Sequence, residues 1–165
     1  MSEKGKPVTS PYPHPGDFQA AFEYAYNRLT NNESCCNWFH ANKEGIDKFQ
    51  DAHYNYTDLG HAVMLENGLI KVTGAATLVG TVYLNTWGPF TNQNMVVATS
   101  NGPKSVFFDF TPPLGLTGTP FRALLLLHEL GHRIGIYGDD TGPINGPLNR
   151  QYTQDTFDHC FGSSQ

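Results

Sequence analysis

The chain has 165 residues, of which 39% are hydrophobic and only 15% are charged, and its formal net charge is −5. This length suits one domain with its own core. The acidic balance argues against a nucleic-acid-binding protein, which needs a basic face, and the short apolar runs predict no membrane insertion.

Helices are predicted in the N-terminal part of the chain. Residues 1–16 are rich in proline and predict a flexible arm, which leaves residues 17–165 as a single domain. Asp17 is a fair N-cap for a first helix that ends near Asn31. The apolar face of this helix follows helical spacing: Phe18, Ala21, Phe22, Ala25 and Leu29. Ser34 is expected to cap a second, shorter helix, and further helical turns follow Gly45.

A block of strands is predicted next. Asn67-Gly68 between two apolar runs predicts a hairpin, since both turn residues need positive φ. Further strands are expected over Thr77–Thr86, Met95–Thr99 and Ser105–Phe110. We therefore predict a mixed sheet of four or five strands.

Two helices are predicted to end the chain. Pro120 suits the first turn of a long helix, and an amphipathic helix is expected from about Asn149 to Phe161. Helices, then strands, then helices indicate an α+β fold.

The helix that begins near Pro120 contains the sequence HELGH, with His128 and His132 four residues apart and Glu129 between them. Histidines at i and i+4 lie about 40° apart on one helix face and can reach the same divalent ion. Glu129 lies beside that face, where its carboxylate can take a proton from metal-bound water. The alternative is a pair of hydrogen-bonded histidines in the core.

The segment Leu127–Gly138, LHELGHRIGIYG, resembles the active-site helix of the zincin metallopeptidases. It is most similar to the branch in which a glycine, here Gly135, ends the helix and turns the chain back to the metal. That branch has its third ligand, a His or Asp, three residues further on, where this chain has Gly138. The last methionine is Met95, so the metzincin Met turn is missing, and no Glu follows Glu129 to act as in gluzincins.

Five side chains after the motif remain as third ligands: Asp139, Asp140, Asp155, Asp158 and His159. Asp139 and Asp140 need only a slightly longer turn after Gly135, and Gly138 supplies the flexibility for it. The C-terminal part of the chain is also similar to small bacterial zincin-like proteins. In these proteins an Asp eight residues after the second histidine recurs, which favours Asp140 over Asp139.

The resemblance implies a minimal zincin-like domain, with a central HExxH helix, that acts as a zinc-dependent metalloendopeptidase. His128, His132 and Asp140 or Asp139 would bind Zn²⁺, and Glu129 would be the general base. Tyr137 would hydrogen-bond an oxyanion near the metal, as tyrosines do in similar enzymes, or would be a half-buried packed aromatic. The strand at Thr77 or the one before the long helix would pair with a peptide substrate.

Other functions fit the same residues. One is an inactive or metal-stabilised zincin-like binding module, closed by a fourth ligand such as His159 or Asp155. Another is a toxin or effector that cuts one specific target. A third is a hydrolase of a non-peptide amide. For the metallopeptidase we expect a peptide or protein substrate, no nucleic acid and no membrane insertion, and a chain that is itself a monomer.

The compartment is inferred from composition and cysteines. Few charged residues favour a secreted or exported protein, although residues 1–7, MSEKGKP, form no signal peptide, and a cytoplasmic protein fits as well. Cys35 or Cys36 would pair with Cys160 and tie the two ends of the domain together, or all three are buried thiols.

Overall fold

The structure is a computed structural model that describes residues 16–57, 64–66, 69–71, 75–78, 80–85, 90, 96–99, 102–105, 116–140 and 146–162. The elements in chain order are α1 (Asp17–Asn31), α2 (Glu33–Trp38), the π-helical turn η1 (Ala41–Gly45), α3 (Ile46–Asp51), β1 (His53–Thr57), β2 (Met64–Glu66), β3 (Leu69–Lys71), β4 (Ala75–Leu78), β5 (Thr81–Asn85), β6 (Val96–Thr99), β7 (Gly102–Ser105), α4 (Gly118–Arg133) and α5 (Gly146–Phe161). The predicted α+β class is confirmed. The predicted arm falls outside the described residues, apart from Gly16.

The predicted first helix is confirmed as α1, but its expected N-cap is corrected: Gly16, at φ 89°, is the N-cap, and Asp17 is the first helical residue. Its buried face, which includes Ala25 and Leu29, packs along α4. The expected cap of α2 is corrected: the side chain of Asn32 accepts a hydrogen bond from the backbone N–H of Cys35 at 3.0 Å, so Asn32 is the cap and Ser34 is not. An Asn at this position satisfies a backbone donor that the first helical turn leaves free.

The largest sheet in the described part of the chain has three strands, in the order β1-β5-β4. β1 is parallel to β5, and β4 is antiparallel to β5, with Thr77 opposite Val82. The expected single strand over Thr77–Thr86 is instead two strands, because the chain turns at Gly80, whose φ of 84° favours glycine. β1 was not predicted, although Tyr54 and Tyr56 alternate with polar residues along it.

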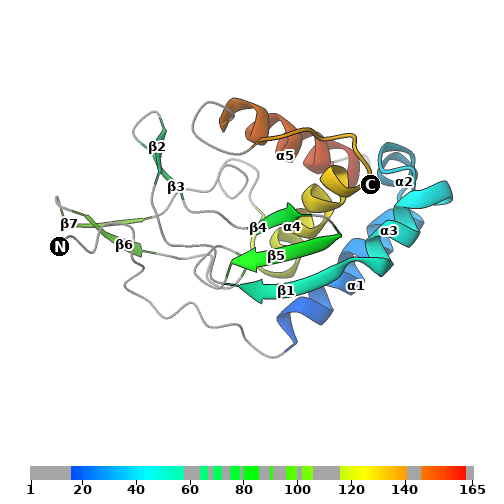
Figure 1. Ribbon diagram of the computed structural model, residues 1–165, viewed down its shortest axis with the longest axis horizontal. Coiled ribbons are helices and arrows are strands. Elements are labelled where there is room, and N and C mark those ends of the chain that lie inside the picture. Colours follow the sequence, from blue (N-terminus) through cyan, green and yellow to red (C-terminus); the bar gives the residue numbers. More distant parts are fainter. Residues whose placement is uncertain are drawn as a thin grey trace.

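The remaining strands form separate pairs. The predicted hairpin around Asn67-Gly68 is the antiparallel pair β2–β3, and β6 pairs with β7. In Figure 1 both pairs lie at one side of the molecule, away from α1 and α3. The predicted single sheet of four or five strands is thus not confirmed, because these ladders are not joined to the three-stranded sheet in the described residues. β7 ends at Ser105, so residues 106–110 of the predicted last strand lie outside the described part.

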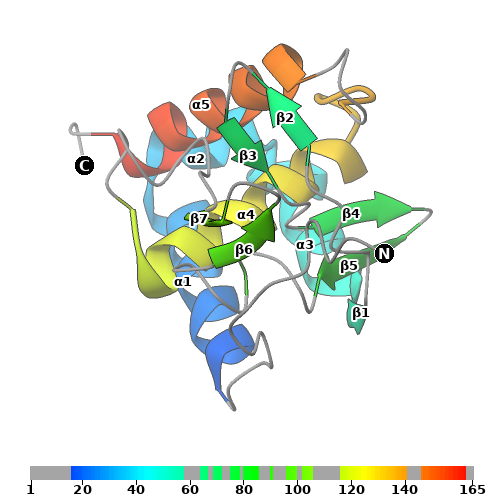
Figure 2. The ribbon, with the colours of Figure 1, turned by 90° about the vertical axis from the view of Figure 1, so that its left-hand side faces the viewer.

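Helix α4 runs through the middle of the fold. Figures 1 and 2 show it between α1, α5 and the sheet. Every residue from Ala123 to Gly131 is buried, His128 and Glu129 included. A helix that is apolar on nearly all sides needs such a position. Within the described residues, no helix is both long and apolar enough for a membrane span.

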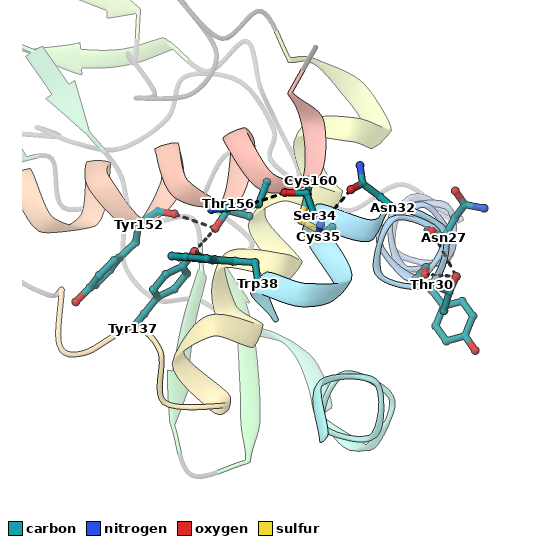
Figure 3. The surroundings of a disulfide bond; sticks show 12 residues. Asn27, Thr30, Asn32, Ser34, Cys35, Trp38, Tyr137, Tyr152, Thr156 and Cys160 are labelled. Atoms are coloured by element: carbon teal, nitrogen blue, oxygen red, sulfur yellow. Dashed lines mark hydrogen bonds between the residues drawn. A yellow bond between two sulfur atoms is a disulfide. The ribbon is translucent and has the colours of Figure 1, made fainter. Parts of the chain in front are cut away.

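Helix α5 packs against α4 and α2, and a disulfide links its C-terminal end to α2. Cys160 is bonded to Cys35, and Cys36 is a free thiol. Figure 3 shows this link beside Trp38 and Thr156. The prediction that one cysteine of the adjacent pair bonds Cys160 is therefore confirmed.

Candidate metal centre

Three side chains that the sequence analysis nominated as metal ligands meet at the C-terminal end of α4. Asp140 Oδ2 lies 2.9 Å from His128 Nε2 and 3.2 Å from His132 Nε2, and the two Nε2 atoms are 3.2 Å apart. His128 is buried, whereas His132 and Asp140 are half-buried. One ligand atom from each residue lies within 4.8 Å of the others, so the three can hold one metal ion.

The turn after α4 brings Asp140 back to the helix. Gly135 adopts φ 81°, and the N–H groups of Ile136 and Tyr137 both donate to the carbonyl of Gly131 at 3.1 Å. This arrangement ends the helix with a left-handed residue and reverses the chain. The predicted end of the helix at Gly135 is confirmed.

The reversed chain packs closely on α4 at Gly131. The ring of Tyr137 lies against the Cα of Gly131, where a Cβ would overlap the ring carbons Cδ2 and Cε2. Gly131, the glycine in HELGH, is therefore required because the ring of Tyr137 approaches its Cα closely, and not because of its φ. The same contact places the ring near both histidines, with centroid distances of 5.6 Å to His128 and 5.9 Å to His132.

Each of the three clustered side chains has a second hydrogen-bond partner. His128 Nδ1 lies 3.1 Å from Thr153 Oγ1, and Asp140 Oδ2 accepts from Asn149 Nδ2 at 2.8 Å. His132 bonds the backbone of Tyr137. Partners of this kind fix the orientation of metal-binding residues and the tautomer of histidines.

Glu129 is held next to the cluster by the sheet. Its Oε2 accepts a hydrogen bond from Thr77 Oγ1, in β4, at 2.6 Å, and Glu129 as a whole is only 5% exposed. The negative charge of Glu129 raises the pKa of His132, so the carboxylate lies within electrostatic reach of the cluster. A buried carboxylate with a hydrogen-bond donor and neighbouring histidines suits proton transfer.

The charges of the cluster support one another. Burial raises the pKa of Asp140, but the hydrogen bonds and charges of the two histidines outweigh it and hold that pKa well below its usual range. Burial lowers the pKa of His132, but its bond to Asp140 and the charges of Glu129 and Asp140 raise the pKa above 6.5. The site therefore attracts positive charge, whether a proton or a metal ion.

No protein-family model, curated protein or solved structure matches this chain. The resemblance to zincins therefore stays a prediction from the sequence.

The other nominated ligands lie elsewhere. Asp139 is exposed and is not part of the cluster. Asp155 and Asp158 accept hydrogen bonds from glutamines on the surface of α5. His159 lies 2.9 Å from Ser34 and stacks on Trp38 at 4.2 Å. Among the residues that the structure describes, Asp140 is therefore the third ligand that the geometry favours.

Tyr137, nominated as an oxyanion donor, has its hydroxyl engaged inside the protein. The hydroxyl accepts a hydrogen bond from Trp38 Nε1 at 2.9 Å and lies 2.8 Å from Thr156 Oγ1. Burial raises its pKa to about 12 although these bonds lower it. In Figure 3 the side chain of Tyr137 lies beside that of Trp38, and its hydroxyl points to Thr156 on α5. These contacts favour the packed aromatic over the catalytic donor.

Three residues of the site were not found from the sequence: Thr77, Asn149 and Thr153. Each acts through a single polar atom that touches a nominated residue. For the two residues of α5 the sequence did contain a signal. Asn149 and Thr153 stand four residues apart and so share one face of a helix whose inward face should otherwise be apolar.

Proposed function

We propose that this protein is a zinc-dependent metallopeptidase of minimal zincin-like architecture, in which His128, His132 and Asp140 bind Zn²⁺. The observation that carries the proposal is the convergence of these three side chains beside Glu129. Two imidazoles and one carboxylate are a usual ligand set of catalytic zinc.

When held by these residues, a zinc ion would supply a Lewis acid for the scissile carbonyl and a water of lowered pKa. Glu129 would act as the general base, whose carboxylate holds the proton before it goes to the leaving amine. Its bond from Thr77 Oγ1 involves only one carboxylate oxygen, Oε2, in the described contacts, which leaves Oε1 for the proton. Thr77 thus orients the carboxylate of Glu129, and α4 holds the backbone of Glu129 in place.

An open position at the metal separates an enzyme from a closed structural site. Catalytic zinc keeps one position for water, whereas structural zinc has four protein ligands. In the described ranges the cluster contains three potential ligands, and His159 and Asp155, the expected fourth ligands, are engaged elsewhere. This arrangement favours catalysis over a metal-stabilised binding module.

A peptide substrate is supported by the position of β4. This strand is at the edge of the three-stranded sheet, and its Thr77 contacts the catalytic carboxylate. An extended peptide can add to a sheet edge through backbone hydrogen bonds. Leu78, the next residue, is 63% exposed and offers an apolar contact to such a peptide.

The test compares wild type with Glu129→Gln in zinc content and in hydrolysis of casein and a mixed peptide library. We expect one zinc per chain in both proteins and hydrolysis by wild type alone, because the amide cannot take the proton. Glu44→Gln, at an exposed acid on η1, is the matched control and should stay active. Hydrolysis by Glu129→Gln at the wild-type rate, or zinc-loaded wild type that cleaves neither substrate, would contradict the proposal as stated.

A further inference from the structure

We propose that α5 is the helix that sets the metal affinity, through a polar face on which Asn149 and Thr153 position the ligands. This inference rests on the proposed metal site and adds to it the residues that orient its ligands.

The polar face of α5 follows helical spacing. Its members stand at i, i+3, i+4 and i+7: Asn149, Tyr152, Thr153 and Thr156. Each contacts the segment that carries the site: Asn149 bonds Asp140, Tyr152 accepts from the N–H of Gly138 at 3.0 Å, Thr153 bonds His128, and Thr156 bonds Tyr137. The solvent side of the same helix is occupied by its own pairs, in which Gln151 bonds Asp155 and Gln154 bonds Asp158.

Thr153 orients the imidazole of His128. The residue is 2% exposed, and its Oγ1 lies 3.1 Å from Nδ1 of the imidazole. When Nδ1–H donates to this hydroxyl, Nε2 keeps its lone pair on the side of His132 and Asp140. Without the hydroxyl, the buried Nδ1–H loses its partner and the ring is freer to rotate.

Asn149 fixes the carboxylate of Asp140. Its Nδ2 donates at 2.8 Å to Oδ2, the same oxygen that faces both histidines. A carboxylate oxygen has two lone pairs, so it can accept this N–H and still bind a cation. Asp140 lies in the segment after α4, outside any helix or strand, and therefore needs such a contact to stay oriented.

The disulfide holds this face in place. Cys160 stands at i+11 from Asn149, which continues the same stripe, and it is fully buried in its bond to Cys35. Figure 3 shows Tyr152, Thr156 and Cys160 on the same side of α5. A covalent link at the end of the stripe opposes rotation of the helix about its axis.

The experiment measures zinc affinity by competition with a chromophoric chelator. Asn149→Ala and the nearly isosteric Thr153→Val are expected to bind zinc roughly 10- to 100-fold more weakly than wild type. Thr153→Ser keeps the hydroxyl and should restore affinity. Gln151→Ala and Gln154→Ala, on the solvent side of α5, are the matched controls and should bind as wild type does.

A second readout separates positioning from folding. Thermal unfolding of the metal-free variants reports stability, and the visible spectrum of the Co²⁺-loaded variants reports ligand geometry. Positioning predicts weaker binding and an altered cobalt spectrum in Thr153→Val even where the metal-free protein remains folded. If wild type binds zinc and both Asn149→Ala and Thr153→Val bind within twofold of it, this inference is wrong and the proposed function stands. If wild type itself binds no zinc, the proposed function fails first.

Discussion

The glycine of HELGH gives a sharp test of how the site is packed. Alanine is about 1 kcal/mol more favourable than glycine inside a helix. If nothing opposed it, Gly131→Ala would therefore raise the free energy of unfolding by about that amount. In this structure the new methyl group would overlap the ring of Tyr137. That ring is buried, stacks on Tyr152 at 4.4 Å and is bonded to Thr156 and Trp38, so it cannot move freely.

The opposing effects give a net magnitude. Overpacking costs about 1–3 kcal/mol, and displacement of the Tyr137 hydroxyl weakens two hydrogen bonds worth about 1 kcal/mol each. After the gain in propensity, we expect Gly131→Ala to lower the free energy of unfolding by about 2–4 kcal/mol. For a chain of this size, the melting temperature should fall by about 5–15 °C.

A double-mutant cycle tests the reason as well as the size. In a Tyr137→Ala background the ring is gone, so Gly131→Ala should become stabilising by about 1 kcal/mol. Urea unfolding in the presence of sucrose, which favours the folded state, measures all four proteins under one condition. If Gly131→Ala alone is as stable as wild type, or if its effect is the same in both backgrounds, the reasoning is refuted.

Three further predictions concern the disulfide, Glu129 and His132. Cys160→Ser opens a link across 125 residues and should cost up to about 5 kcal/mol in urea unfolding, whereas Cys36→Ser should stay within about 0.5 kcal/mol of wild type. Thr77→Val leaves the buried carboxylate of Glu129 without its donor and should cost about 1–3 kcal/mol by the same assay; an unchanged midpoint would count against that contact. In metal-free protein the raised pKa of His132 contributes stability below pH 6.5 that is lost as pH rises through that pKa, so His132→Gln should destabilise more at about pH 5.5 than at about pH 8.5. An equal effect of His132→Gln at both pH values would contradict the shift.

The helices of this fold were predictable because their signals are local. The apolar spacing from Phe18 to Leu29 marks α1, and the apolar surroundings of HELGH mark a central α4. The sheet was not predictable in the same way. A turn at Gly80 divides one β-rich run into two antiparallel strands, and β1 pairs in parallel with a strand more than twenty residues away. Such pairing depends on tertiary contacts that no local pattern records.

The site shows the same division. His128, Glu129 and His132 are fixed by spacing within one helix, so the sequence alone places them together. The turn at Gly135, which is also local, predicted that Asp139 or Asp140 would return to the helix, and only the resemblance favoured Asp140. The supporting residues come from β4 and α5. Thr77 has no pattern that distinguishes it from a surface residue, whereas the i, i+4 spacing of Asn149 and Thr153 indicates a polar inward face but not which side chains it contacts. Tyr137 shows what a local pattern leaves out. Its position near the two histidines was predicted, but the partners of its hydroxyl come from α2 and α5.

The central claim, that His128, His132 and Asp140 form a metal site, is tested most directly by the zinc content of purified protein. Elemental analysis should be made on wild type, Asp140→Ala and Asp139→Ala. We predict one zinc per chain in wild type and in Asp139→Ala, and a loss of zinc in Asp140→Ala, because in the described part of the chain Asp140 is the acid that clusters with both histidines. Folded wild type without stoichiometric metal, or zinc lost from Asp139→Ala and kept in Asp140→Ala, would contradict the account.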